Sequence, residues 1–235
     1  MSFSFSPKIV TDGLVLYLDA ANTRSYVSGS TVWNDLSRSG NNGLLISEPT
    51  FSRDGGGSIV FNGTTQYVDL GSTINNYIRI NLPYTIEVVV NMSVSGTDQA
   101  FIGNAWTSPG FLIRKLSTNS IRFIFLQDGG TYRAKDSPVL TSGWYHVVAT
   151  YNGSGVNTLS NYALYINSST IGVTDLSNGT ITSIVPPNNI NLGRSGDSAG
   201  FAYFNGKIPI ARMYNRALSA SEVLQNYNTT KGRFL

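Results

Sequence analysis

The 235-residue chain has no cysteine and a single histidine, and charged residues make up only 12% of it. Without cysteine it forms no disulfide bond, no thiolate nucleophile and none of the common zinc sites. Glutamate is also scarce, with three residues in the whole sequence. These scarcities remove most of the side chains with which enzymes carry out acid–base and nucleophilic chemistry. The absence of cysteine is compatible with both an oxidising and a reducing compartment.

Charge of one sign is not concentrated anywhere along the chain. Sixteen Lys and Arg stand against 13 Asp and Glu, a formal net charge of +3. Binding to nucleic acid through counterion release is therefore not expected. No stretch approaches the ~18 apolar residues of a membrane-spanning helix. The opening MSFSFSPKIV lacks the basic and apolar regions of a secretory signal, so we expect any release from a cell to follow another route, such as lysis.

What the chain does contain is a series of short apolar runs separated by Gly, Asn, Ser and Asp, and 41% of its residues are hydrophobic. Alternation with a period of two predicts β-strands, and the Asn-Gly and Asp-Gly pairs between them predict tight turns. The expected strands are Gly13–Ala20, Ser58–Phe61, Gln66–Leu70, Tyr84–Met92, Ala100–Asn104, Phe111–Leu116, Ser120–Gln127, Trp144–Tyr151, Asn161–Asn167, Ile190–Arg194 and Lys207–Asn215. We predict an all-β fold in which residues 1–235 form one domain, a two-sheet antiparallel sandwich.

One short helix is expected near the end of the chain, over residues 219–231. Ser219 and Glu222 have the spacing of a capping box, which satisfies the first free N–H groups of a helix. A helix of this length is unstable alone, so we expect it to dock on the sandwich. Residues 1–12 are expected to form an N-terminal arm or an edge strand. Pro209 lacks an N–H group and is expected at a sheet edge or a bulge.

No arrangement of catalytic residues is apparent in the sequence. Glycoside hydrolysis normally needs two carboxylates, which on one strand means acidic residues two or four positions apart. Glu48, Glu87 and Glu222 have no such partner, and a pair assembled from separate strands is the alternative. His146 lies inside an expected strand with no nucleophilic serine elbow nearby, so we expect a buried, hydrogen-bonded structural histidine. The sequence therefore predicts a protein that is not an enzyme.

Calcium is the one cofactor that the loops offer ligands for, because it accepts carboxylate, amide and backbone oxygens at turns. The candidate part-sites pair Asp19 with Asn22, Asp35 with Asn41 and Asn42, and Asp98 with Gln99. Asx-turns account for each of these groups equally well. The sequence therefore leaves both alternatives, a structural calcium ion and simple Asx-turns, at these residues.

Aromatic and planar polar side chains in loop-like stretches are the candidate ligand contacts. A ring in such a place can stack on the face of a sugar or anchor a protein partner. The candidates are Trp106, Tyr132, Arg133, Asp197, Phe201 and Tyr203. The alternative is that these rings cap the ends of the sandwich. Trp33 and Trp144 are expected in the core instead.

Several stretches, taken in order along the chain, resemble the motifs of one family. They are GLVLYLDAAN at 13–22, WNDLS at 33–37, GNNG at 40–43, GSIVFNG at 57–63, WYHVVATY at 144–151, NLGR at 191–194, FNGKI at 204–208, YNRALS at 214–219 and GRF at 232–234. In this order they resemble the laminin-G-like, concanavalin A-like jelly-roll domains of structural proteins of tailed bacteriophages, cyanophages among them. The chain departs from the family's pattern at residues 167–170 and at Pro209. The family's glycan and calcium sites vary, so no binding residue is transferred from it.

The resemblance implies a jelly-roll sandwich displayed on a virion as a capsid decoration, head fibre or tail-associated adhesin. We therefore expect a non-catalytic protein on the surface of the phage particle, with other virion proteins and copies of itself as partners. A host-surface glycan is a further expected partner, whereas nucleic acid and membrane are not. A free lectin-like carbohydrate-binding module is the alternative, and a polysaccharide-cleaving enzyme is the third hypothesis.

Overall fold

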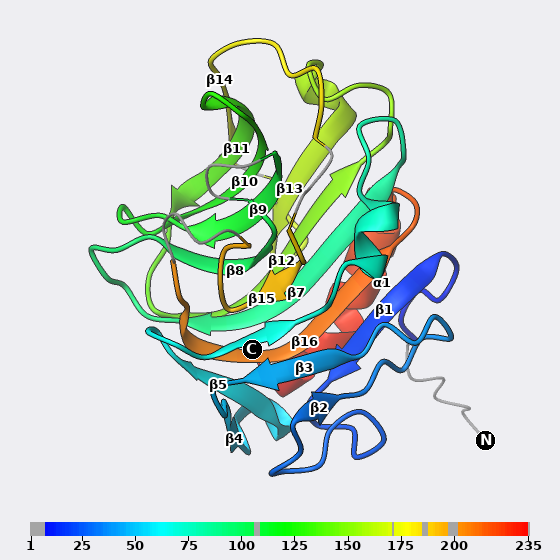
Figure 1. Cartoon of the computed structure of the whole chain (residues 1–235), viewed down its shortest axis with the longest axis vertical. Coiled ribbons are helices and arrows are strands. Elements are labelled where there is room, and N and C mark those ends of the chain that lie inside the picture. Colours follow the sequence, from blue (N-terminus) through cyan, green and yellow to red (C-terminus); the bar gives the residue numbers. More distant parts are fainter. Residues whose placement is uncertain (1–7, 106–108, 171, 185–187, 197–201, 235) are drawn as a thin grey trace, which may run out of the picture.

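A computed structural model gives the arrangement of the chain (Figure 1) and describes residues 8–105, 109–170, 172–184, 188–196 and 202–234. Two antiparallel sheets and one short C-terminal helix form a jelly-roll sandwich, as the sequence predicts. Most of the expected N-terminal arm lies outside the described residues. The described part of it, residues 8–12, forms no strand.

The first sheet has seven strands and runs in the order β13, β12, β7, β16, β5, β4, with β1 also paired to β16. Its strands are β1 (Leu14–Asp19), β4 (Thr50–Ser52), β5 (Ser58–Asn62), β7 (Tyr84–Met92), β12 (Gly143–Tyr151), β13 (Tyr162–Ile166) and β16 (Asn205–Tyr214). The long strands β7, β12 and β16 lie side by side at its centre, so the sheet is built on the most apolar runs of the sequence.

The second sheet has nine strands in the order β14, β11, β10, β9, β8, β15, β6, β3, β2. These are β2 (Val32–Trp33), β3 (Gly43–Ile46), β6 (Tyr67–Asp69), β8 (Gln99–Gly103), β9 (Gly110–Lys115), β10 (Ser120–Gln127), β11 (Thr131–Val139), β14 (Thr174–Ser177) and β15 (Asn191–Leu192). Four short 3₁₀ turns also occur among the described residues, at Asp54–Gly56, Thr73–Tyr77, Leu159–Asn161 and Lys231–Arg233.

The core between the sheets is rich in aromatic rings. Phe125 of β10 packs against Tyr84, Phe123, Tyr151 and Tyr162, with ring centroids between 4.8 and 6.4 Å apart. These rings come from strands of both sheets. Alternate residues of a strand point to the same face, so each strand directs its rings into the space between the sheets. Trp33 is also fully buried in this core, as expected.

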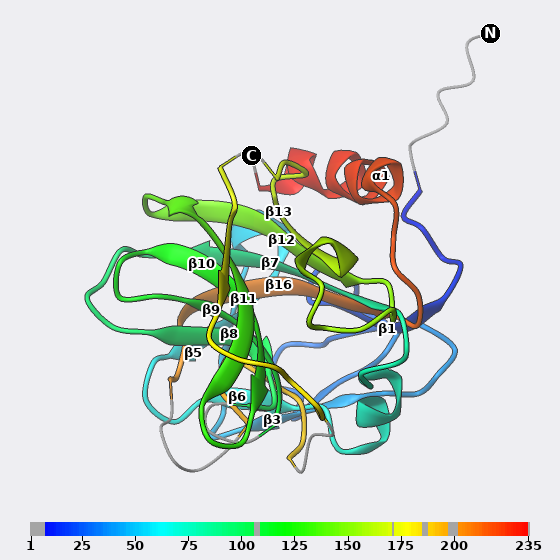
Figure 2. The same cartoon turned by 90° about the horizontal axis from the view of Figure 1, so that it is seen from above.

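The outer face of the seven-stranded sheet is covered by α1 (Ala220–Thr230), which lies across it on the side turned away from the second sheet (Figure 2). Ser219 and Glu222 form the predicted capping box. Val223 of the helix packs against Val148 and Tyr214 of the sheet. The central strands are therefore buried on both faces, because one face meets the core and the other meets this helix.

Pro209 lies at one of the two places expected for it, whereas Trp144 does not lie where it was expected. Pro209 is in a central strand, not at an edge, but the pairing of β16 with β7 shifts between Lys207 and Ile210, which is the predicted bulge. Trp144 is not in the core, because its position in β12 places it on the same outer face as His146. Its ring packs against Phe234, with the centroids 4.9 Å apart.

Candidate functional site

Three of the ligand contacts expected from the sequence, Trp106, Asp197 and Phe201, lie outside the described residues. Tyr132 and Arg133 are not in a loop as expected, because both belong to strand β11. Consecutive residues of a strand point to opposite faces, so these two side chains cannot contact one ligand from the same side. Tyr132 packs on the outer face of the nine-stranded sheet, whereas Arg133 is buried.

Tyr203 lies in another part of the molecule. Its ring is 6.4 Å from that of Tyr67 on β6, and the guanidinium of Arg194 stacks on the same Tyr67 ring at 3.9 Å. Four strands separate β6 from β11 in the order of the sheet. The described candidates therefore do not converge on one pocket.

The carboxylates considered for calcium already accept hydrogen bonds from protein donors. Both oxygens of Asp19 bind the guanidinium of Arg233, at 2.9 and 3.0 Å. Asp35 accepts from the backbone N–H groups of Tyr17 on β1 and of Ser37 and Asn41 in its own loop. Asp98 pairs with Arg114 at 3.1 Å. Within the described ranges, no three His, Cys, Asp or Glu side chains converge as metal ligands. Asx-turns and ion pairs account for these carboxylates. A structural calcium ion therefore stays an expectation without assigned ligands.

A buried charge network lies between the seven-stranded sheet and α1. One oxygen of Glu87 on β7 accepts hydrogen bonds from Arg212 and from Nε2 of His146, the latter at 2.9 Å. Its other oxygen accepts from the side-chain amide of Asn226 on α1, at 2.7 Å. Asn226 also binds the backbone N–H of Val10 at 2.8 Å, so the network ties the N-terminal segment and the helix to the sheet.

The network holds Glu87 in its charged form. Burial by itself raises the pKa of this carboxyl, but the Arg212 guanidinium and the hydrogen bond from His146 outweigh burial and bring the pKa down to about 2. The side chains of His146 and Glu87 are 3% and 0% exposed. His146 is thus the buried, hydrogen-bonded residue that the sequence predicts. The carboxylate and the imidazole, closed off by α1, link the sheet to the helix.

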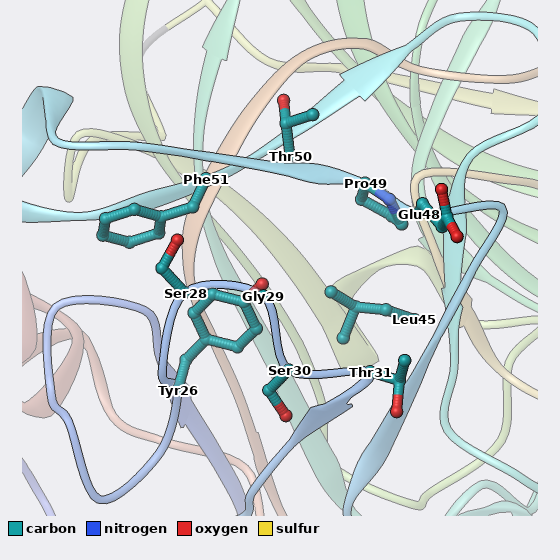
Figure 3. A pocket seen from close by; sticks show the side chains of 10 residues that line it. All are labelled: Tyr26, Ser28, Gly29, Ser30, Thr31, Leu45, Glu48, Pro49, Thr50 and Phe51. Carbon is teal, nitrogen blue, oxygen red and sulfur yellow. The ribbon is translucent and has the colours of Figure 1, made fainter.

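An open pocket lies away from this network, where the loop after β1 meets the turn between β3 and β4 (Figure 3). Its volume is about 430 Å³. We call it the Tyr26–Phe51 pocket, and it is lined by Tyr26, Ser28, Gly29, Ser30, Thr31, Leu45, Glu48, Pro49, Thr50 and Phe51. Pockets of this size bind small molecules in many proteins.

Local backbone features give this pocket its shape. Ser47 and Glu48 have positive φ angles of 59° and 53°, which turn the chain sharply before Pro49. The side chain of Gln66 holds this turn by donating to the carbonyl of Glu48 at 2.9 Å. On the facing side, Leu45 donates its N–H to the carbonyl of Thr31 at 2.8 Å, which fixes the loop against β3.

The pocket has an aromatic side and a polar side. Tyr26 and Phe51 lie together on one side, with ring centroids 5.8 Å apart, while Glu48 and Thr31 lie on the other (Figure 3). Tyr26 is anchored by Trp33 beneath it, at 6.4 Å. In the part of the chain that the structure describes, the Glu48 carboxylate and the Ser28 and Thr31 hydroxyls have no hydrogen-bond or ionic partner. These groups are free to bind a ligand.

No local pattern in the sequence indicates this pocket. Tyr26, Glu48 and Phe51 are separated along the chain and belong to no motif, and Glu48 stood out only as one of three glutamates. Their convergence depends on the pairing of β3 with β6 and of β4 with β5, which places the two strands in different sheets.

Comparison with known proteins agrees with the fold. None of the curated proteins matches the chain. Among solved structures, the binding domain of paraclostridial mosquitocidal protein 1 is similar, with 18% identity and a TM-score of 0.67 over 92% of this chain and 52% of that one. The binding domain of botulinum neurotoxin serotype G is similar too, with 16% identity and a TM-score of 0.65 over 91% and 50%.

A third similar structure is that of Trypanosoma rangeli sialidase in complex with sialic acid, with 14% identity and a TM-score of 0.64 over 98% of this chain and 36% of that one. The chain thus spans about half the length of the two toxin binding domains. At these identities the likeness concerns the fold. No helix of the described residues is long and apolar enough to cross a membrane.

The family comparison covers most of the chain, although the Tyr26–Phe51 pocket precedes the matched part. The model of the concanavalin A-like lectin/glucanases superfamily matches residues 62–224. This range contains β6 to β16 and the first half of α1, which form the greater part of both sheets. The chain belongs to the concanavalin A-like lectin/glucanases superfamily.

Proposed function

We propose that this chain is a non-catalytic, lectin-like glycan-binding module whose ligand enters the Tyr26–Phe51 pocket. The observation that carries the proposal is the pairing of aromatic rings with unpartnered polar groups across one pocket. A sugar ring has an apolar face of C–H groups and a rim of hydroxyls. The half-buried ring of Phe51, which packs on the buried Tyr26, offers a surface for the face, and the Glu48 carboxylate and neighbouring hydroxyls offer partners for the rim.

The charge of the pocket favours neutral sugars or amino sugars. Glu48 is the one charged residue among those lining it. Its carboxylate would repel a sugar acid but would accept hydrogen bonds from two hydroxyls or from an ammonium group. We therefore expect neutral hexoses to bind more tightly than uronic or sialic acids.

The same composition supports a role without catalysis. Glycoside hydrolysis normally requires a pair of carboxylates at the scissile bond. The pocket offers one, and Glu87 is enclosed beneath α1. Incubation with polysaccharide should therefore release no reducing ends. Release that disappears in Glu48→Gln would establish an enzyme instead.

The binding experiment begins with a glycan array and continues with calorimetry on the glycans that bind. Removing a charged hydrogen-bond acceptor should weaken binding roughly 10- to 100-fold in Glu48→Gln. Asp128→Asn is the matched control, because it removes an exposed carboxylate from a turn outside the pocket. Tyr132→Ala tests the contact expected from the sequence and should leave the affinity unchanged. Unaltered binding in Glu48→Gln would place the ligand elsewhere, and an array without any ligand would refute glycan binding.

We also propose that the module is carried on the surface of a tailed-phage particle. What supports this is the order of motifs from residues 13–22 to 232–234, which resembles that of phage structural proteins. Partners would then be other virion proteins and further copies of the chain. The protein should sediment with intact particles in a density gradient. Recovery only from the soluble fraction of a lysate would contradict the virion role while leaving glycan binding untouched.

A further inference from the structure

A buried ammonium group lies at the end of β9, far in the sequence from the Tyr26–Phe51 pocket. Lys115 is 0% exposed, which is unusual for a lysine. Its Nζ lies within 3.3 Å of five oxygen atoms. We call these atoms the oxygen cage: Ser95 Oγ at 2.8 Å, Thr97 O at 2.9 Å, Ser95 O at 3.0 Å, Asn119 Oδ1 at 3.2 Å and Leu116 O at 3.3 Å.

The oxygen cage has more acceptors than an ammonium group can satisfy. An ammonium carries three N–H donors, so the five oxygens share them. Three of the oxygens also accept from other donors: Leu116 O from the N–H of Asn119 at 2.8 Å, Asn119 Oδ1 from the N–H of Ser95 at 2.9 Å, and Ser95 Oγ from the amide of Gln99 at 3.2 Å. Converging carbonyl oxygens are also what replaces the hydration shell of potassium in ion channels. None of the five belongs to a carboxylate, the group that calcium sites normally supply. The cage is therefore formed of neutral dipoles suited to one positive charge.

The oxygen cage joins the two sheets. Ser95 and Thr97 belong to the connection from β7 to β8, which crosses from the seven-stranded to the nine-stranded sheet. Leu116 and Asn119 belong to the turn between β9 and β10, and Asn119 also accepts the N–H of Ser95 at 2.9 Å. Without a cation at the centre, the carbonyl oxygens of Ser95 and Thr97 would lose the one donor that the described residues give them, which costs stability.

The calcium part-site expected at Asp98 and Gln99 falls on this same connection. The Asp98 carboxylate instead accepts the N–H of Ser117 at 2.7 Å and pairs with Arg114, so it is not part of the oxygen cage. The positive charge beside this connection is that of the Lys115 ammonium group.

We propose that the oxygen cage is a monovalent-cation site that the protein fills with its own Lys115 ammonium. Potassium or ammonium ions would occupy it in a variant without the lysine side chain, and no metal ion enters while the lysine is present. This inference stands independently of glycan binding.

The test compares Lys115→Ala with Lys115→Met by thermal unfolding in choline, potassium and ammonium chlorides at equal ionic strength. Both variants should lose about 6–12 °C in Tm in choline chloride, because both leave the oxygen cage without its charge. Potassium or ammonium should restore at least half of this loss in Lys115→Ala, which leaves room for the ion. They should restore none in Lys115→Met, whose side chain fills the space. The wild type should have the same Tm in all three salts.

Two outcomes of this series overturn the proposal. One is an equal Tm of Lys115→Ala in all three salts, and the other is rescue by calcium but not by monovalent ions. If neither variant folds, the wild-type protein provides the measurement. In ¹⁵N-labelled protein the ammonium protons of Lys115 should exchange slowly enough with water to be seen by NMR, unlike those of the exposed Lys8 and Lys231. Exchange as fast as that of Lys231 would refute a closed cage.

Discussion

Replacing Glu87 by glutamine measures how much the charge network beneath α1 contributes to stability. The pKa of the Glu87 carboxyl is about 2, against an ordinary value of 4.5. One pKa unit corresponds to about 1.36 kcal/mol, so this difference corresponds to about 3 kcal/mol. Breaking a buried ion pair on one side typically costs 3–5 kcal/mol, which agrees in size. We expect Glu87→Gln to lower the free energy of unfolding by about 3 kcal/mol at neutral pH.

The pH dependence gives this prediction a second readout. Because the folded protein has the lower pKa, the contribution of Glu87 is complete above about pH 4.5 and is lost as the pH falls toward 2. Urea unfolding of wild type and variant at a series of pH values should therefore show a difference that shrinks in this window. A constant difference, or a loss below about 1 kcal/mol at neutral pH, would refute the reasoning.

Glu222→Gln is the matched control for that experiment. Its carboxyl also has a pKa of about 2, owing first to its hydrogen bond from Arg216, with burial opposing the shift. This carboxylate is 28% exposed, so water screens the interaction, and we expect a loss of at most about 1 kcal/mol. A larger loss in Glu222→Gln than in Glu87→Gln would show that burial does not decide the contribution.

Three further predictions concern the fold and are checked by the same urea unfolding. Ser219→Ala removes the N-cap of α1 and should cost about 1 kcal/mol; a cost near zero would show that the capping box is not used in solution. Phe125→Ala leaves a cavity among four aromatic rings and should cost about 3–5 kcal/mol. Gly193→Ala should cost about 1–3 kcal/mol more than Gly129→Ala, since both have positive φ but only the first would place its Cβ 2.7 Å from the Phe61 ring. Equal costs for the two glycine variants would argue against that close approach.

The long strands and the helix could be predicted because their signals are local. In β12, the alternate residues Tyr145, Val147, Ala149 and Tyr151 face the core, as period-two alternation indicates. Strand β11 was missed because its sequence, TYRAKDSPV, contains charged residues and a proline that are typical of a loop. Its pairing with β10 overrides that local tendency.

The candidate site could not be predicted in the same way. Tyr26, Glu48 and Phe51 come from a loop, a turn and a short strand that meet only after both sheets have formed. The sequence predicts Tyr132 and Arg133 in a loop, but the strand that contains them separates their side chains onto opposite faces. Whether a polar group is free or already bonded also depends on neighbours distant in the sequence.

By itself, the sequence determined the all-β sandwich, the capped helix that docks on it and the buried place of its single histidine, because hydrophobic periodicity and turn residues act over a few positions. Tertiary structure alone decided which charges are enclosed and which are available. It joined Glu87 to Arg212 and placed Lys115 among the oxygens of two distant turns. It also left Glu48 beside two aromatic rings without a partner among the described residues. The physical reason is that burial and hydrogen bonding of a side chain are set by strands that pair across the whole chain.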